Sequence, residues 1–122
     1  MAAGQYNFTI EQGATLKKQF TYKDSTGAVV DLTGYEARMQ IRDTIGSSDK
    51  IADFDNASKG GLAILPTTGS DVSGTIELHI HYSSSTLYSF SEAVYDLEIE
   101  YSESVTRLLQ GRVKLSKEVT RD

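Results

Sequence analysis

The segment that most constrains this chain is residues 31–42, with the sequence DLTGYEARMQIR. Asp31 and Gly34 are typical of a tight turn, because Asp hydrogen-bonds nearby backbone and Gly tolerates a positive φ. After the turn, apolar and polar residues alternate strictly, with Tyr35, Ala37, Met39 and Ile41 on one parity and Glu36, Arg38, Gln40 and Arg42 on the other. A period of two predicts a β-strand with one buried and one exposed face. We therefore expect Met39 and Ile41 to face a core.

Most of the chain repeats this pattern in short segments that are separated by turn-forming residues. Strands are predicted at 6–10, 16–22, 35–42, 51–54, 62–65, 76–82, 95–101 and 105–115, and Gly111 suggests a β-bulge in the last of them. Residues 83–91 are the one candidate for a helical turn, with Ser85 or Thr86 as its cap. About eight short strands with at most one short helical turn predict an all-β fold, an antiparallel β-sandwich. An open barrel is the alternative.

Length and composition narrow the possible partners. At 122 residues, we expect a single β-sandwich domain over 1–122 with a polar C-terminal tail at 116–122. The chain has no Cys, and therefore neither disulfides nor thiolate metal sites. A net charge of −5 argues against nucleic acid as a partner. The sequence shows no signal-peptide pattern and no stretch of ~18 apolar residues, so we expect no membrane partner either.

Two clusters have residue types that bind metal ions. His79 and His81 share one strand face with Glu77, a set that suits Zn²⁺ or Ni²⁺. Structural zinc sites normally use four ligands, so an exposed polar strand face is favoured and no metal or cofactor is expected.

Residues 53–58 resemble a calcium loop in composition, with oxygen-bearing side chains at Asp53, Asp55, Asn56 and Ser58. The EF-hand spacing fails because Ala57 stands where a ligand belongs. A turn closed by side-chain-to-backbone hydrogen bonds is favoured.

Catalysis is not indicated by the acidic residues. Asp96, Glu98 and Glu100 form a stripe on one face of a predicted strand, where Arg107 and Arg112 of the next strand are expected to pair with them. A glycosidase needs one carboxyl group in an apolar pocket and another across a cleft. No convergent acid, base and nucleophile are evident, so we expect no enzyme and assign no catalytic residue.

Interface residues were sought among the aromatic side chains. Most Tyr and Phe residues fall on the inward parity of the predicted strands, so the core is their default position. Tyr88 and Phe90 lie in the irregular segment and are the best candidates for exposed anchors. Tyr6 and Phe8 complete the predicted interface set.

Four segments together resemble a family of small structural proteins of tailed bacteriophages: FTIEQGATL (8–16), DLTGYEARMQIR (31–42), VYDLEIEY (94–101) and RLLQGRVKLSKEVTR (107–121). The chain is also similar to the N-terminal domains of phage baseplate upper proteins, which are β-sandwiches that tie receptor-binding parts to the tail. The matching segments cover somewhat under half of the chain.

The resemblance implies a non-enzymatic structural protein of the virion, assembled in the host cytoplasm. It suggests a tail or baseplate adaptor that links the tail core to fibre or receptor-binding parts. Its partners would be other virion structural proteins, with multiple copies in a symmetric assembly. A capsid-associated cement or neck protein is an alternative, and so is a carbohydrate-binding module.

Overall fold

The structure is a computed structural model, and it describes residues 4–57, 59–65 and 74–117. The nine described strands are β1 (Gly4–Gln5), β2 (Phe8–Glu11), β3 (Leu16–Thr21), β4 (Glu36–Arg42), β5 (Lys50–Asp55), β6 (Leu62–Leu65), β7 (Thr75–Ile80), β8 (Glu92–Tyr101) and β9 (Ser104–Ser116). One short helix, α1 (Tyr82–Ser85), follows β7. The predicted all-β fold is confirmed.

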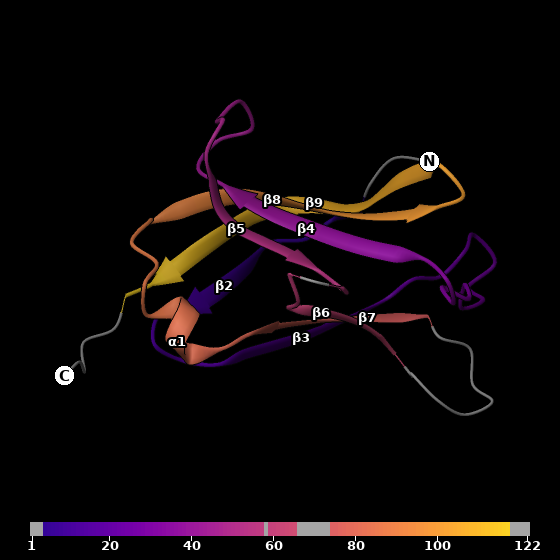
Figure 1. Cartoon of the computed structure of the whole chain (residues 1–122), viewed down its shortest axis with the longest axis horizontal. Coiled ribbons are helices and arrows are strands. Elements are labelled where there is room, and N and C mark those ends of the chain that lie inside the picture. The colour runs from indigo at the N-terminus through magenta and orange to yellow at the C-terminus, as the bar shows by residue number, and fades with distance from the viewer. Residues whose placement is uncertain (1–3, 58, 66–73, 118–122) are drawn as a thin grey trace.

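The strands form two open sheets that lie as two layers (Figure 1). The larger sheet has the order β1-β9-β8-β4-β5, with β2 also paired to β9, and the smaller has the order β3-β7-β6. The larger sheet is mixed, because β1 and β2 run parallel to β9. The other strand pairs are antiparallel, as predicted, so the prediction of an antiparallel sandwich is corrected only where β1 and β2 join β9.

The core lies between the layers and follows the period-two pattern. In β4, Ala37, Met39 and Ile41 are almost fully buried, which confirms the predicted inward face. The other buried apolar residues are Phe8, Ile10, Leu32, Phe54, Leu62, Ile76, Leu78, Ile80, Ala93, Tyr95, Leu97, Ile99, Val113 and Leu115. Both sheets contribute, and burial of this alternating face is what holds them together.

The N-terminal segment covers one edge of the larger sheet. It passes over Gly111 of β9, where a Cβ atom would collide with the carbonyl oxygen of Tyr6. The Tyr95 hydroxyl donates to that carbonyl oxygen at 2.6 Å, and Asn7 Oδ1 accepts from the amide of Arg112 at 2.8 Å. Gly111 therefore permits a close backbone approach. The register shift lies elsewhere, between Leu97 and Glu98 of β8, so the bulge predicted at Gly111 was misplaced.

Several predicted boundaries differ from the structure. The strand predicted at 76–82 ends at Ile80, because His81 is the N-cap of α1 and Tyr82 is the first helical residue. Thr86 is the C-cap, and Ser85 is a buried helical residue whose hydroxyl donates to Ala14 O. Between β3 and β4, Lys23 and Val29 form an isolated antiparallel bridge.

The hairpin between β8 and β9 turns through two residues, Ser102 and Glu103, which both have positive φ. That geometry is typical of a two-residue hairpin loop. At the far end of β9, Ser116 pairs with Glu11, so the predicted tail 116–122 begins inside a strand. Residues 118–122 lie outside the described part, as do Ser58 and residues 66–73.

Candidate interaction site

The four predicted interface residues fall into two separate pairs, neither of them fully exposed. Phe8 is 7% exposed and packs edge-on against Tyr95, with 5.0 Å between ring centroids. Tyr6 is half-buried and packs edge-on against Phe20. The prediction that Phe8 is an interface anchor is therefore not supported by its burial.

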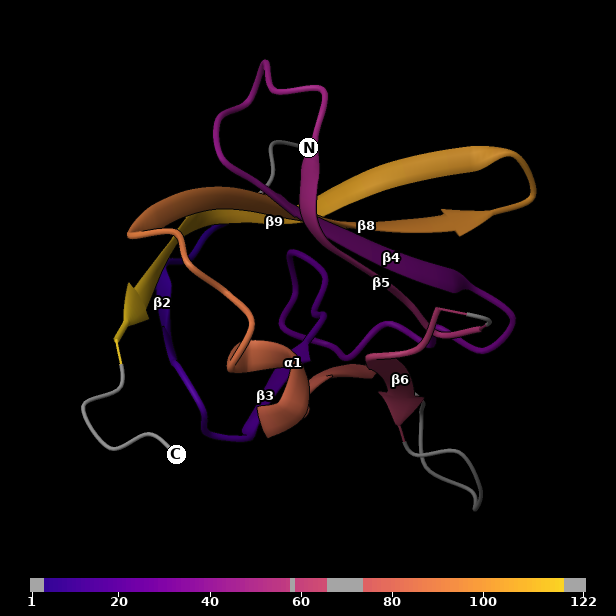
Figure 2. The same cartoon turned by 60° about the vertical axis from the view of Figure 1, so that its left-hand side comes forward.

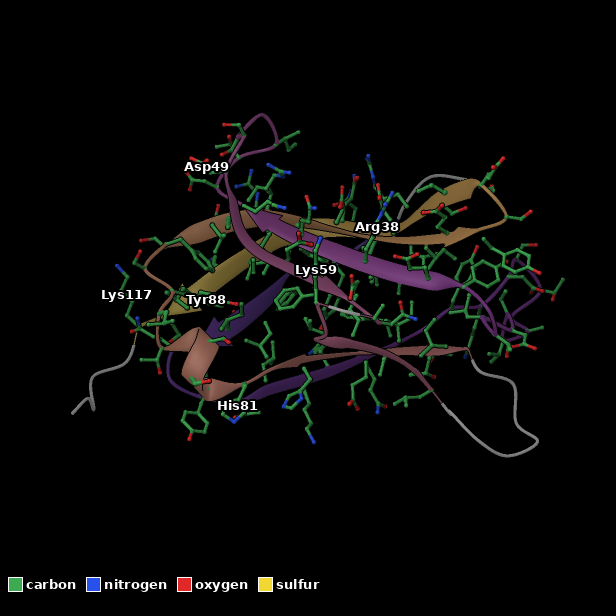
Figure 3. The ribbon with its side chains drawn as sticks, in the orientation of Figure 1. Arg38, Asp49, Lys59, His81, Tyr88 and Lys117 are labelled. Atoms are coloured by element: carbon green, nitrogen blue, oxygen red, sulfur yellow. The ribbon has the colours of Figure 1, made fainter. Side chains whose placement is uncertain are left out.

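Tyr88 and Phe90 follow α1, and their ring centroids are 5.9 Å apart. The side-chain amide of Gln12, just after β2, donates to the carbonyl oxygen of Tyr88 at 2.8 Å. Both are half-buried against the core, so they are not the freely exposed anchors that the sequence suggested. Burial raises the pKa of the Tyr88 hydroxyl. Figure 3 shows Tyr88 between the two layers, beside α1.

Tyr88 and Phe90 line a groove of about 1020 Å³ between β5 of the larger sheet and β6 of the smaller one. Its apolar surface includes Phe54, Leu62 and Ile80, which also belong to the core. Leu87, 81% exposed, lies beside it. Here the sandwich exposes part of its interior along the open edges of both sheets.

The groove is more acidic than basic. Asp43, Asp53 and Glu77 line it, with Lys59 as the one Lys or Arg among its described lining residues. Asp53 Oδ2 lies 2.9 Å from the ammonium groups of both Lys50 and Lys59. These ammonium groups counteract the effect of burial and lower the pKa of Asp53.

The loop between β5 and β6 shapes one end of the groove. Asp55 Oδ1 accepts hydrogen bonds from the amides of Ala57, Lys59 and Gly60, at 2.9 to 3.2 Å. These bonds lower the pKa of Asp55. The loop is thus a turn closed by side-chain-to-backbone bonds, as favoured over a calcium site.

Of the two histidines weighed as metal ligands, His81 caps the helix α1 at the other end of the groove. His81 Nδ1 accepts from the amide of Ser83 at 3.2 Å, which caps α1. The ring of His79 lies 6.5 Å from that of His81, measured between centroids. No group of three or more His, Cys, Asp or Glu residues in the described part of the chain is arranged to hold a metal ion.

The outer face of the larger sheet carries a network of ion pairs. Asp96 lies 3.5 Å from Arg107, as predicted, whereas Glu98 lies 3.1 Å from Arg38 of β4. Arg112, predicted to pair with this stripe, contacts Glu92 instead. Arg38 was missed because strand order, which brings β4 beside β8, is a tertiary property.

Within this network, burial and the neighbouring Glu98 raise the pKa of Asp96, although Arg107, Arg42 and Arg38 act in the opposite direction. The carboxylates thus face arginines across the strands. The arrangement stabilises strand pairing modestly, as exposed ion pairs do.

Further exposed apolar side chains lie at separate places on the surface. Ile45, 89% exposed, lies on the loop between β4 and β5 that projects from the larger sheet (Figure 1). Tyr101 and Val105 flank the tip of the β8–β9 hairpin, which extends beyond the rest of the sandwich (Figure 2). Tyr82 lies on α1. Sequence reasoning missed these residues because alternation alone does not show where a strand leaves the core.

Comparisons with known proteins bring no further assignment. The chain matches no protein-family model, and no curated protein is significantly similar to it. No helix in the described ranges is long and apolar enough to cross a membrane.

Proposed function

We propose that this protein is a non-enzymatic structural component of a tailed-phage virion, an adaptor in the tail or baseplate that links the tail core to fibre or receptor-binding parts. The observation that carries the proposal is the distribution of exposed apolar side chains. They occur at the β4–β5 loop, at the hairpin tip and beside α1, which are well separated (Figure 2). An adaptor needs two or more contact surfaces, and large apolar side chains are typical anchors of such surfaces.

The location of the phage-like segments supports the same proposal. FTIE forms β2, EARMQIR forms β4, and the two C-terminal segments contribute to β8 and β9. These strands are neighbours in the larger sheet. In the turn before β4, Asp31 Oδ1 accepts from the amide of Thr33 at 3.0 Å, and Gly34 has a φ of 84°. The resemblance therefore follows one continuous structural unit.

The test is a phage that lacks this protein. We expect filled heads, missing or disordered fibres or an unfinished baseplate, and poor adsorption to the host. Adding the purified protein together with the missing fibre component should restore adsorption. Negative-stain micrographs and an adsorption assay provide both measurements.

Two other outcomes would favour the alternatives. Normal tails with fragile or leaking heads would indicate a cement or neck protein. Normal particles that fail to bind one host glycan would indicate a carbohydrate-binding module, for which the stacked pair of Tyr35 and the half-exposed Tyr101 is the best platform, with centroids 4.9 Å apart.

Point variants separate contact from folding. Ile45→Asp and Tyr101→Ser alter exposed side chains, so both proteins should fold normally. Their incorporation into particles should fall below that of the wild type, measured by quantitative immunoblotting. Asp49→Asn, in the same loop as Ile45 (Figure 3), serves as the control and should incorporate normally.

A further inference from the structure

We propose that the groove between β5 and β6 is the docking site for an extended strand of another virion protein, in which apolar residues alternate with basic ones. The inference rests on the proposed function, and it specifies the chemistry of one partner. Four features of the described residues carry it: an open strand edge, a filled counterpart, a side-chain pattern and an unbalanced charge.

The first feature is the open edge of β5. In the described chain, β5 pairs with β4 on one side and with no strand on the other. Its end is occupied, because the amide of Asp55 donates to Gly60 O at 2.9 Å and Asp55 bridges Gly61. The open stretch is therefore residues 51–54. Such an edge can accept a further strand through main-chain hydrogen bonds.

The second feature is the filled counterpart at the opposite edge of the same sheet. There, β2 pairs with β9, and its residues alternate between buried Phe8 and Ile10 and exposed Thr9 and Glu11. An extended segment of alternating character thus already closes one side of this sandwich. The β5 side has the same kind of opening without such a segment among the described residues.

The third feature is the side-chain pattern of β5. Ala52 and Phe54 pair with the buried residues Ile41 and Met39, so they share the inward face. Asp53 lies between them on the outward face, where it meets Lys50 and Lys59. A strand added beside β5 would therefore place alternate residues over apolar surface and over the ion pairs that Asp53 forms with Lys50 and Lys59.

The fourth feature is the charge of the groove. Asp43 lines it and has no cationic group within 4 Å among the described residues. Glu77 also lines it, but its carboxylate lies on the outward face of β7 and accepts from Gln19 at 3.0 Å. Because the chain carries a net charge of −5, a second copy would be repelled there. A basic strand is complementary, and Leu87 adds exposed apolar surface for its other face.

The experiment uses a fluorescent peptide of about seven residues that alternates valine and lysine, a length suited to a short strand. A valine–glutamate peptide is the matched probe. We expect saturable binding of the basic peptide in fluorescence polarisation, and weak or no binding of the acidic one. Amide hydrogen exchange should slow in β5 on binding and stay unchanged in β3, which is also an open edge.

Two pairs of variants test the location. Asp43→Lys should weaken peptide binding about fivefold, which is the upper range for an exposed ion pair. Asp49→Lys makes the same charge change in the same loop but outside the groove, and it should change the peptide affinity less than about twofold. Leu87→Ser should also weaken binding, and Ile45→Ser should not. All four side chains are exposed, so folding is preserved.

Several results would overturn the proposal. These are equal binding of both peptides, equal effects of Asp43→Lys and Asp49→Lys, or protection of β3 in place of β5. Concentration-dependent dimers that Asp43→Lys abolishes would identify a second copy of the chain as the occupant. That result would also reject the proposal. If the peptide fails to bind but phage lacking the protein lose their fibres, the groove assignment fails and the adaptor function stands. If the peptide binds as expected and those phage are normal, the adaptor function fails.

Discussion

The two edges of the larger sheet differ in how they end. At the β9 edge, the N-terminal segment adds β1 and β2 in parallel, and Phe8 and Ile10 complete the core. At the β5 edge no described strand is added, and core residues such as Phe54 border a groove of about 1020 Å³. We call the β9 side, where β1 and β2 pair, the sealed edge, and the β5 side, which borders the groove, the open edge.

The difference shows what closes a sandwich of this size. Strand pairing at β9 is accompanied by close backbone contacts at Gly111 and by aromatic packing around Tyr6 and Tyr95. The β5 side relies on half-buried Tyr88 and Phe90 and on the closed turn at Asp55. We therefore expect side chains at the sealed edge to contribute more to stability, and side chains at the open edge to contribute more to binding.

The largest expected effect is the loss of an aromatic ring at the sealed edge. Phe8→Ala should lower the free energy of unfolding by about 3–5 kcal/mol, because the ring is buried and leaves a cavity. Phe90→Ala, at the open edge, should cost less than ~2 kcal/mol, since its ring is only half-buried. Urea denaturation measures both. Equal losses would show that the two edges contribute alike to the core.

A smaller effect is expected where the N-terminal segment crosses β9. Gly111→Ala should cost about 1–3 kcal/mol, because the added methyl group forces Tyr6 and its neighbours away from the strand. Gly46→Ala is the matched control in an open loop, and it should change stability by less than ~0.5 kcal/mol. If Gly111→Ala is equally harmless, the N-terminal segment does not pack on β9 as described.

Variants of the two histidines at the open side should change the free energy of unfolding by less than the Gly111 variant does. His81→Ala removes the cap of α1 and should cost about 1 kcal/mol, whereas His79→Ala, on the exposed strand face, should cost less than ~0.5 kcal/mol. Thermal melts of both variants measure the difference. Zn²⁺ in modest excess should leave the wild-type Tm unchanged. A rise of several degrees that His79→Ala abolishes would instead reveal a metal site.

The smallest effect concerns two aspartates with opposite pKa shifts. The pKa of Asp55 is lowered by hydrogen bonds, so its stabilisation is present above the unfolded pKa of about 3.9 and is lost as pH falls through the folded value. The pKa of Asp96 is raised by burial, so its charged form destabilises the fold, and that cost disappears as pH falls toward about 4.

Asp55→Asn should therefore lower stability at pH ~7, and Asp96→Asn should leave it unchanged or raise it. The Asp96→Asn difference from the wild type should shrink as the pH falls toward ~4, whereas the Asp55→Asn difference should persist to ~4 and shrink only below it. Urea denaturation at several pH values tests this. A loss of stability at neutral pH for Asp96→Asn equal to that for Asp55→Asn would show that the pair with Arg107 outweighs burial.

Much of the fold was predictable because alternation is a local property. The inward residues of β4, β7 and β8 were predicted correctly except at strand ends, where Tyr82 and Tyr101 leave the core. The candidate site was predicted less well. Residues 83–91 were correctly singled out as an irregular segment, but Leu87 was not identified, because its exposure depends on how α1 turns the chain.

By itself, the sequence determined an all-β chain, the face of each main strand that is buried, and the turns at Asp31 and Asp55, because each depends on neighbouring residues. Strand order, the parallel addition of β1 and β2, the pairing of Arg38 with Glu98 and the groove beside β5 were decided by tertiary structure. Each of these brings together residues far apart in the chain. Which distant edges meet depends on the packing of the whole core, and no local pattern carries that information.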